Sequence, residues 1–90
     1  MELEFTKNGE MYEATFTAEG NFALHIERAE AGEIDMYQTS VEGATPALVK
    51  IDGWGYRSDK VIDTDVSVLV APKYITIKSK NQPTMAVVLQ

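Results

Sequence analysis

Side chains able to carry out chemistry are few in this 90-residue sequence. It contains no cysteine and a single histidine, His25, two positions before Glu27. A histidine beside a carboxylate can bind a metal or respond to pH, but this spacing is also that of two outward residues on one strand. Because no second histidine or cysteine could complete a metal site, we interpret His25 as a surface residue.

Three aspartates, Asp59, Asp63 and Asp65, lie close together in the sequence and carry oxygens of the kind that calcium binds. Calcium takes six to eight such ligands, and this spacing falls short of a calcium loop. Aspartate is also common in turns, where its side chain accepts backbone hydrogen bonds, so we predict a turn here. We predict no catalytic residue, no metal and no cofactor, and therefore a protein that is not an enzyme.

The most specific local feature is the segment Gly53–Asp59, in which Trp54 and Tyr56 alternate with glycines and Arg57 follows. Two exposed aromatic rings can stack on a sugar, and aromatics with an arginine beside them are typical anchors of protein interfaces. Alternatively, Trp54 folds back to fill an open end of a thin core. Tyr37 and Tyr74, at outward strand positions, would extend either kind of binding surface.

Apolar and polar residues alternate through most of the chain, the pattern of half-buried strands. The pattern places Phe16 inward on a first strand, 11–17, and Phe22 inward on a second, 21–28, and residues 18–21 are predicted to join the two as a hairpin. Further strands are predicted at 33–38, 47–51, 66–70, 74–78 and 85–89, with a short one at 3–5.

This spacing, near ten residues from strand to strand and with no crossover helix, indicates an all-β fold. We predict a single-domain antiparallel β-sandwich over residues 1–90, jelly-roll-like, with about eight strands. The only stretch with helical composition, 27–33, is too short and ends at Gly32.

The net charge of −6 is unevenly distributed, because residues 1–45 hold ten of the fourteen acids and only two bases. The six bases of the second half are too scattered for a nucleic-acid surface. Three of them, Lys73, Lys78 and Lys80, are predicted to point outward near the penultimate strand, to pair with an acidic partner or to guard an exposed sheet edge. We expect no membrane span and no signal peptide.

Three runs of sequence, 11–17, 21–28 and 65–77, resemble small virion proteins of tailed bacteriophages, and most closely the auxiliary capsid proteins of crAss-like phages of Bacteroides. The resemblance covers about residues 11–89 and rests on the overall pattern of strands in the sequence. It implies a β-sandwich made in the host cytoplasm that decorates the outer capsid in many copies. The implied partners are the major capsid protein, neighbouring virion proteins or copies of itself, and head fibres, and the partner-binding candidates are Trp54, Tyr56, Arg57, Lys73, Lys78 and Lys80.

A different class of function remains open. A carbohydrate-binding or adhesion module would use Trp54 and Tyr56 as a stacking platform. A module of this kind should bind glycans with an affinity that salt hardly affects. A decoration protein should instead bind a capsid lattice with an affinity that falls as salt is added.

Overall fold

The computed structural model describes residues 1–20, 22–30, 32–48, 50–51, 54–55, 62–68 and 73–90. Within these residues the protein is all-β, as predicted, with antiparallel pairing and no helix, and so no helix that could cross a membrane. The strands are β1 (Thr6–Asn8), β2 (Met11–Ala18), β3 (Phe22–Arg28), β4 (Ile34–Thr39), β5 (Ala47–Leu48), β6 (Lys50–Ile51), β7 (Trp54–Gly55), β8 (Ile62–Val68), β9 (Lys73–Ser79) and β10 (Pro83–Leu89).

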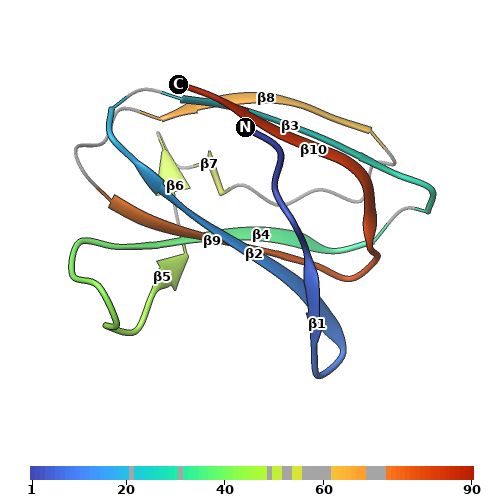
Figure 1. The fold of residues 1–90 in the computed structure, drawn as a ribbon, viewed down its shortest axis with the longest axis horizontal. Coiled ribbons are helices and arrows are strands. Elements are labelled where there is room, and N and C mark those ends of the chain that lie inside the picture. The colour runs from blue at the N-terminus through green and yellow to red at the C-terminus, as the bar shows by residue number, and fades with distance from the viewer. Residues whose placement is uncertain (21, 31, 49, 52–53, 56–61, 69–72) are drawn as a thin grey trace.

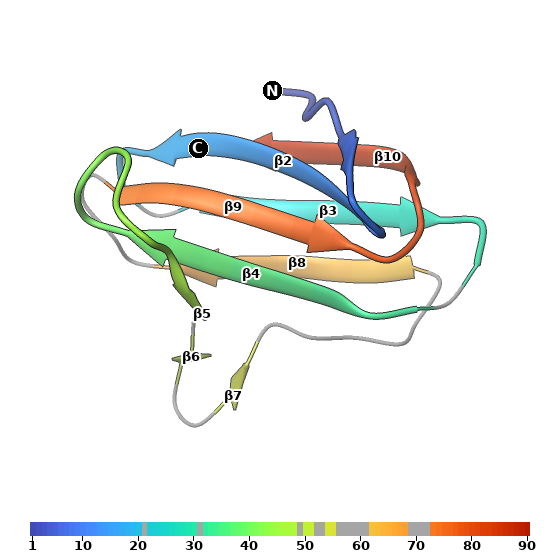
Figure 2. The ribbon, with the colours of Figure 1, turned by 90° about the horizontal axis from the view of Figure 1, so that it is seen from below.

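The strands form one sheet in the order β1-β2-β9-β4-β5, a second in the order β10-β3-β8, and the short pair β6-β7. Figures 1 and 2 show the two larger sheets as two layers. Each of the six long strands, β2, β3, β4, β8, β9 and β10, lies in the opposite sheet from the long strand before it. The chain therefore passes from layer to layer at every connection between long strands.

Among the described residues, apolar side chains at alternating strand positions form the core. Phe16, Ile75 and Ile77 from the five-stranded sheet meet Leu24 and Ile26 from the three-stranded sheet in one buried cluster. The cluster also contains Ala18, Phe22, Ile34, Met36, Ala86 and Val88. Burial of a large aliphatic or aromatic side chain contributes about 1.5–3 kcal/mol, so this shared cluster is what holds the two layers together.

The predicted hairpin between β2 and β3 is wrong. β2 pairs with β1 and β9, whereas β3 pairs with β8 and β10. A four-residue turn over 18–21 would pair Thr17 with Phe22, and directly paired residues share a face. Thr17 is exposed while Phe22 is only 2% exposed, so the pairing would have buried the one or exposed the other. Instead the link changes layer, and the Phe16 and Phe22 rings meet edge-to-face at 5.1 Å.

The N-terminal segment joins both sheets along one side of the molecule. Glu2 pairs with Val87, and the Leu3 N–H donates to the Ala86 carbonyl at 2.9 Å, which places this part beside β10. Leu3 and Phe5 then pack against the core, and the chain enters β1 beside β2. Figure 1 shows this crossing in front of the two layers. The predicted short strand at 3–5 is thus displaced to Thr6–Asn8, because the intervening residues bridge the sheets.

Two further differences concern the middle of the chain. The strand predicted at 47–51 corresponds to two elements, β5 and β6, and β7 was not predicted as a strand. The described residues therefore form ten strands where about eight were predicted. Asp63 and Asp65 lie inside β8, not in a turn, and Asp63 pairs with Ile26 across the sheet. Val66 and Val68 belong to this same strand. Because the residues before them are mostly polar, the alternation did not show that the strand begins at Ile62.

Candidate binding faces

Lys78 lies on the outer face of the five-stranded sheet, as predicted, and is neutralised there by its neighbours. Its Nζ is 3.4 Å from Glu13 Oε1 and 5.0 Å from the centre of the Tyr37 ring. Asn8 Nδ2 donates to the other Glu13 oxygen at 3.0 Å. This hydrogen bond and, after it, Lys78 lower the pKa of Glu13 below its ordinary value of 4.5, against the opposing effect of partial burial. The Lys78 charge is thus already engaged within the protein.

The prediction that these lysines guard a sheet edge is wrong for β9. This strand lies in the middle of its sheet, with β2 on one side and β4 on the other. Pairing on both sides leaves no free backbone for another strand to join. Sequence order could not reveal this, because the penultimate strand of the chain is the central strand of the sheet.

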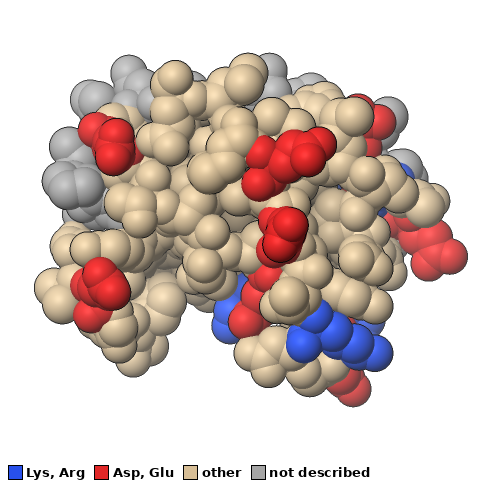
Figure 3. All heavy atoms as spheres, viewed as in Figure 1, with Lys and Arg blue, Asp and Glu red and all other residues tan. Residues whose placement is uncertain are grey.

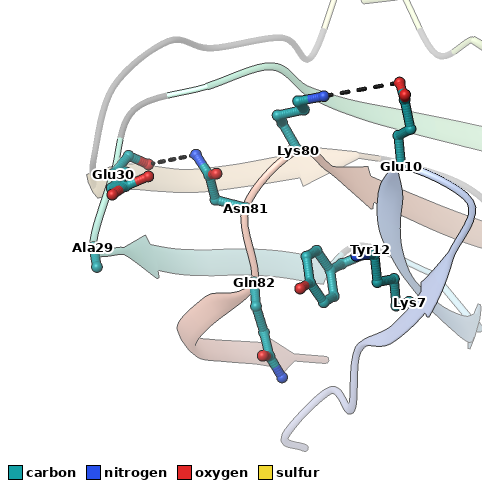
Figure 4. Close-up of a pocket in the computed structure, with 8 residues that line it drawn as sticks. All are labelled: Lys7, Glu10, Tyr12, Ala29, Glu30, Lys80, Asn81 and Gln82. Atoms are coloured by element: carbon teal, nitrogen blue, oxygen red, sulfur yellow. Dashed lines mark hydrogen bonds and ion pairs between the residues drawn. The ribbon is translucent and has the colours of Figure 1, made fainter.

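Lys80 follows the end of β9 and borders a hollow of about 370 Å³. Figure 4 shows the residues around it, with the Lys80 side chain directed toward Glu10 at 4.0 Å. Lys7 Nζ lies 6.0 Å from the centre of the Tyr12 ring, and Asn81 Nδ2 donates a hydrogen bond to the Glu30 carbonyl at 3.1 Å. Acids and bases alternate around this hollow, so it favours no charge of ligand. Lys78 and Lys80 each pair with an acid of the first half of the chain, Glu13 and Glu10, so the acidic first half and the more basic second half meet in the fold.

The other predicted partner-binding residues fall in the least described part of the chain. Trp54 begins β7 and pairs through its backbone with Ile51, and Lys73 begins β9 opposite Ala18. Tyr56 and Arg57 lie outside the described residues. The roles predicted for this loop and for Lys73 remain predictions.

His25 lies on the outer face of the three-stranded sheet, where the alternation placed it. Its Nε2 is 2.9 Å from Glu27 Oε2, and the two side chains are 35% and 37% exposed. Among the described residues, no group of three or more histidine, cysteine, aspartate or glutamate side chains is arranged to hold a metal. The pair is therefore a surface contact between two residues of one strand.

An exposed apolar strip on β10, made of Met85, Val87 and Leu89, was missed by the sequence reasoning. Met85 is 48% and Leu89 61% exposed, and Val87 lies between them on the same outer face. Across the sheet from the three lie Glu27, His25 and Ala23. The sequence does carry a signal for this strip, because residues 85–89 are apolar at every position. A strand with one solvent-exposed face usually alternates apolar and polar residues. The strip gives β10 an apolar outer face as well as an apolar inner one.

Tyr37 and Tyr74 point outward from the five-stranded sheet, as predicted, and both are partly buried. Beside Tyr74 the connection between β4 and β5 folds along the sheet and encloses a second hollow of about 370 Å³. Threonines of β2, β4 and β9 line it.

Figure 3 shows the side of the molecule on which the N-terminal segment crosses, with acidic groups spread over it and basic groups gathered near its lower edge. No single-sign patch large enough to steer a nucleic acid is visible there. Comparison of the chain with known protein families, with curated proteins and with solved structures finds no match. The function therefore has to be argued from these faces.

Proposed function

We propose that this domain is a jelly-roll-like β-sandwich that acts as a non-enzymatic auxiliary capsid protein of a tailed phage. In this proposal it decorates the outer capsid surface through contacts with the major capsid protein, after synthesis in the bacterial cytoplasm. Neighbouring virion proteins, other copies of the chain and head fibres are further contacts. The repeated passage of the chain between two layers supports the fold assignment, and the strand texture of residues 11–89 supports the class of protein.

The single observation that carries a docking role is the apolar strip on β10. Three apolar side chains, the exposed Met85 and Leu89 with the half-buried Val87 between them, lie in a row on the outer face of β10. Side by side they form the kind of exposed apolar surface that marks a protein contact site. Glu27 opposite Met85, and Glu2 opposite Val87, give the strip an acidic border. A capsid surface with an apolar patch and basic groups around it would match this arrangement.

A strip of this size supports only a modest affinity for one copy. On a capsid the same contact is repeated, and contacts between neighbours raise the effective concentration of each copy. Because the lysines at 78 and 80 already face acids of their own chain, we assign the salt-sensitive part of the attachment to the acidic border.

The test begins with mass spectrometry of density-gradient fractions of a phage lysate, comparing this chain with the most abundant capsid protein. Co-migration with particles at a fixed ratio is expected. A chain that stays in the soluble fractions would remove the decoration proposal.

Two matched variants then test the surface. Val87→Lys places a charge in the strip, and Val41→Lys makes the same exchange at a position that is 65% exposed in the β4–β5 connection. Both should fold, as judged by thermal unfolding followed by circular dichroism. Purified Val87→Lys is expected to bind particles stripped of the protein at least tenfold more weakly, and Val41→Lys to bind normally. Equal binding by the two variants would show that β10 is not the contact surface.

A further inference from the structure

The outer face of the five-stranded sheet carries rows of hydroxyl groups. The register puts Thr15, Thr76 and Tyr37 directly beside one another on β2, β9 and β4. The next row along the strands is Thr17, Tyr74 and Thr39. Neighbouring strands lie about 4.8 Å apart and same-face residues about 7 Å apart, so the rows form a grid of hydroxyls on the scale of one sugar ring.

The β4–β5 connection turns this face into a groove with a defined wall. Glu42, Gly43, Ala44 and Pro46 line one side of the hollow described above, against Thr15, Thr17, Tyr74 and Thr76 on the sheet. The wall is held by its own hydrogen bonds. Thr39 Oγ1 accepts from the Val41 N–H at 3.3 Å, and the Ala44 N–H donates to the Val41 carbonyl at 3.1 Å. Gly43, with φ of 82°, makes the reversal that returns the chain toward β5.

The groove has the chemistry of a site for an uncharged polyol. Hydroxyls both donate and accept hydrogen bonds, so an array of them can satisfy the hydroxyls of a sugar in either sense. Tyr74 adds a ring with an apolar face and a polar tip. Among the described residues that line the hollow, Glu42 is the one that is charged. On the same face of β9, the charge of Lys78 is occupied by Glu13 and the Tyr37 ring.

We infer that this groove is a binding site for one or two units of a neutral carbohydrate chain. The site is separate from the apolar strip, since the two lie on the outer faces of different sheets. Sugar binding here and docking through β10 are therefore independent. The volume of about 370 Å³ falls at the lower end of the range for small-molecule sites, which suits a short segment of a longer chain.

The test uses isotope-labelled protein and amide chemical-shift mapping with a panel of neutral oligosaccharides, namely hexamers of glucose, mannose, xylose and N-acetylglucosamine. Heparin-derived hexasaccharide serves as the anionic comparison. At least one neutral hexamer is expected to shift the amides of 15–17, 39–44 and 74–76 in a saturable way that salt hardly changes. Shifts confined to residues 53–59, a response to the anionic sugar alone, or no response to any neutral hexamer would overturn the inference.

Variants distinguish binding at this site from non-specific binding of sugar. Thr15→Val with Thr76→Val removes two hydroxyls while keeping shape and strand preference, and is expected to weaken the sugar about tenfold or more. Thr6→Val, on exposed β1 of the same sheet, is the matched control and should bind as the unaltered protein does. Equal affinity for the double variant and the control would mean that the hydroxyl grid is not the site. Val87→Lys should leave sugar binding intact, which keeps this test distinct from the capsid test.

Discussion

The contact between Phe16 and Phe22 gives the sharpest test of how the layers are joined. The two rings lie at the point where the chain leaves β2 for β3, with centres 5.1 Å apart and planes at 84°. They come from different sheets, so their contact exists only if the link changes layer. In a hairpin built on a four-residue turn, Phe16 and Phe22 would point to opposite faces of one sheet.

The expected energies set the choice of variants. Replacing a buried phenylalanine with alanine costs about 3–5 kcal/mol, and a domain of this length is stable by about 5–13 kcal/mol, so a double alanine variant would lose most of its stability and could not be measured accurately. Leucine keeps much of the apolar volume and removes the ring-to-ring geometry. Edge-to-face aromatic pairs contribute about 0.5–1.5 kcal/mol beyond the area they bury. The double leucine variant should therefore be more stable, by about 1 kcal/mol, than the sum of the two single effects implies.

The four proteins of this double-mutant cycle are the unaltered protein, the two single leucine variants and the double leucine variant. The assay is their unfolding by urea at 25 °C, followed by circular dichroism. A second cycle combines Phe16→Leu with Met85→Ala, which lies on the outer face of the other sheet, and is expected to be additive. Additivity within about 0.3 kcal/mol in the Phe16–Phe22 cycle would refute the contact and reopen the hairpin. A change in the denaturant slope of one variant would void the comparison for that variant, so all slopes are compared first.

Three other perturbations test single features. Ile77→Ala, at a fully buried position in the central strand, should cost about 3–4 kcal/mol in urea unfolding, whereas Thr76→Ala on the outer face should cost less than about 1. Glu13 has a lowered pKa because of Asn8 and then Lys78, so its ionised form stabilises the fold above pH 4.5 and the benefit is lost as pH falls through the lowered value. The stability difference between the unaltered protein and Glu13→Gln should accordingly shrink from pH 7 to pH 3, and a constant difference would contradict the pairing. Gly43→Ala meets no atom within 4 Å but forces a positive φ, so a cost of about 1 kcal/mol is expected, and no measurable change would show that the turn relaxes.

Much of the inward and outward assignment was predictable, because it depends on neighbours in the sequence. Phe22, Leu24 and Ile26 are inward and His25 is outward, as the alternation predicts. Alternation cannot indicate which strand pairs with which, and every pairing between long strands is remote in the sequence. That is why the hairpin, the edge position of β9 and the extent of β8 were predicted wrongly.

The candidate sites were less predictable for a related reason. Lys78 could be placed on an outer face, but its partner Glu13 is brought beside it only by the β2–β9 register. Arg28 occupies an inward position and is 2% exposed, with Nη1 donating to the Gly32 carbonyl at 2.6 Å. The alternation of β3 places this arginine inward, but it does not indicate that the Gly32 carbonyl lies there to accept its hydrogen bond. The apolar outer face of β10 was the exception, since its composition alone departs from alternation.

The passage of the chain between layers at each long connection has a consequence for how the protein is made. β2 finds its long partner only when β9 has been synthesised, and β3 needs both β8 and β10. Chains dominated by such distant pairings fold slowly, on the scale of milliseconds to seconds. On the ribosome the first four strands would emerge with their apolar faces uncovered. The five-stranded sheet could not close until β9 had been released, nor the three-stranded sheet until β10 had been released. Newly made chains would thus depend on chaperones to a degree that the small size of the domain does not suggest.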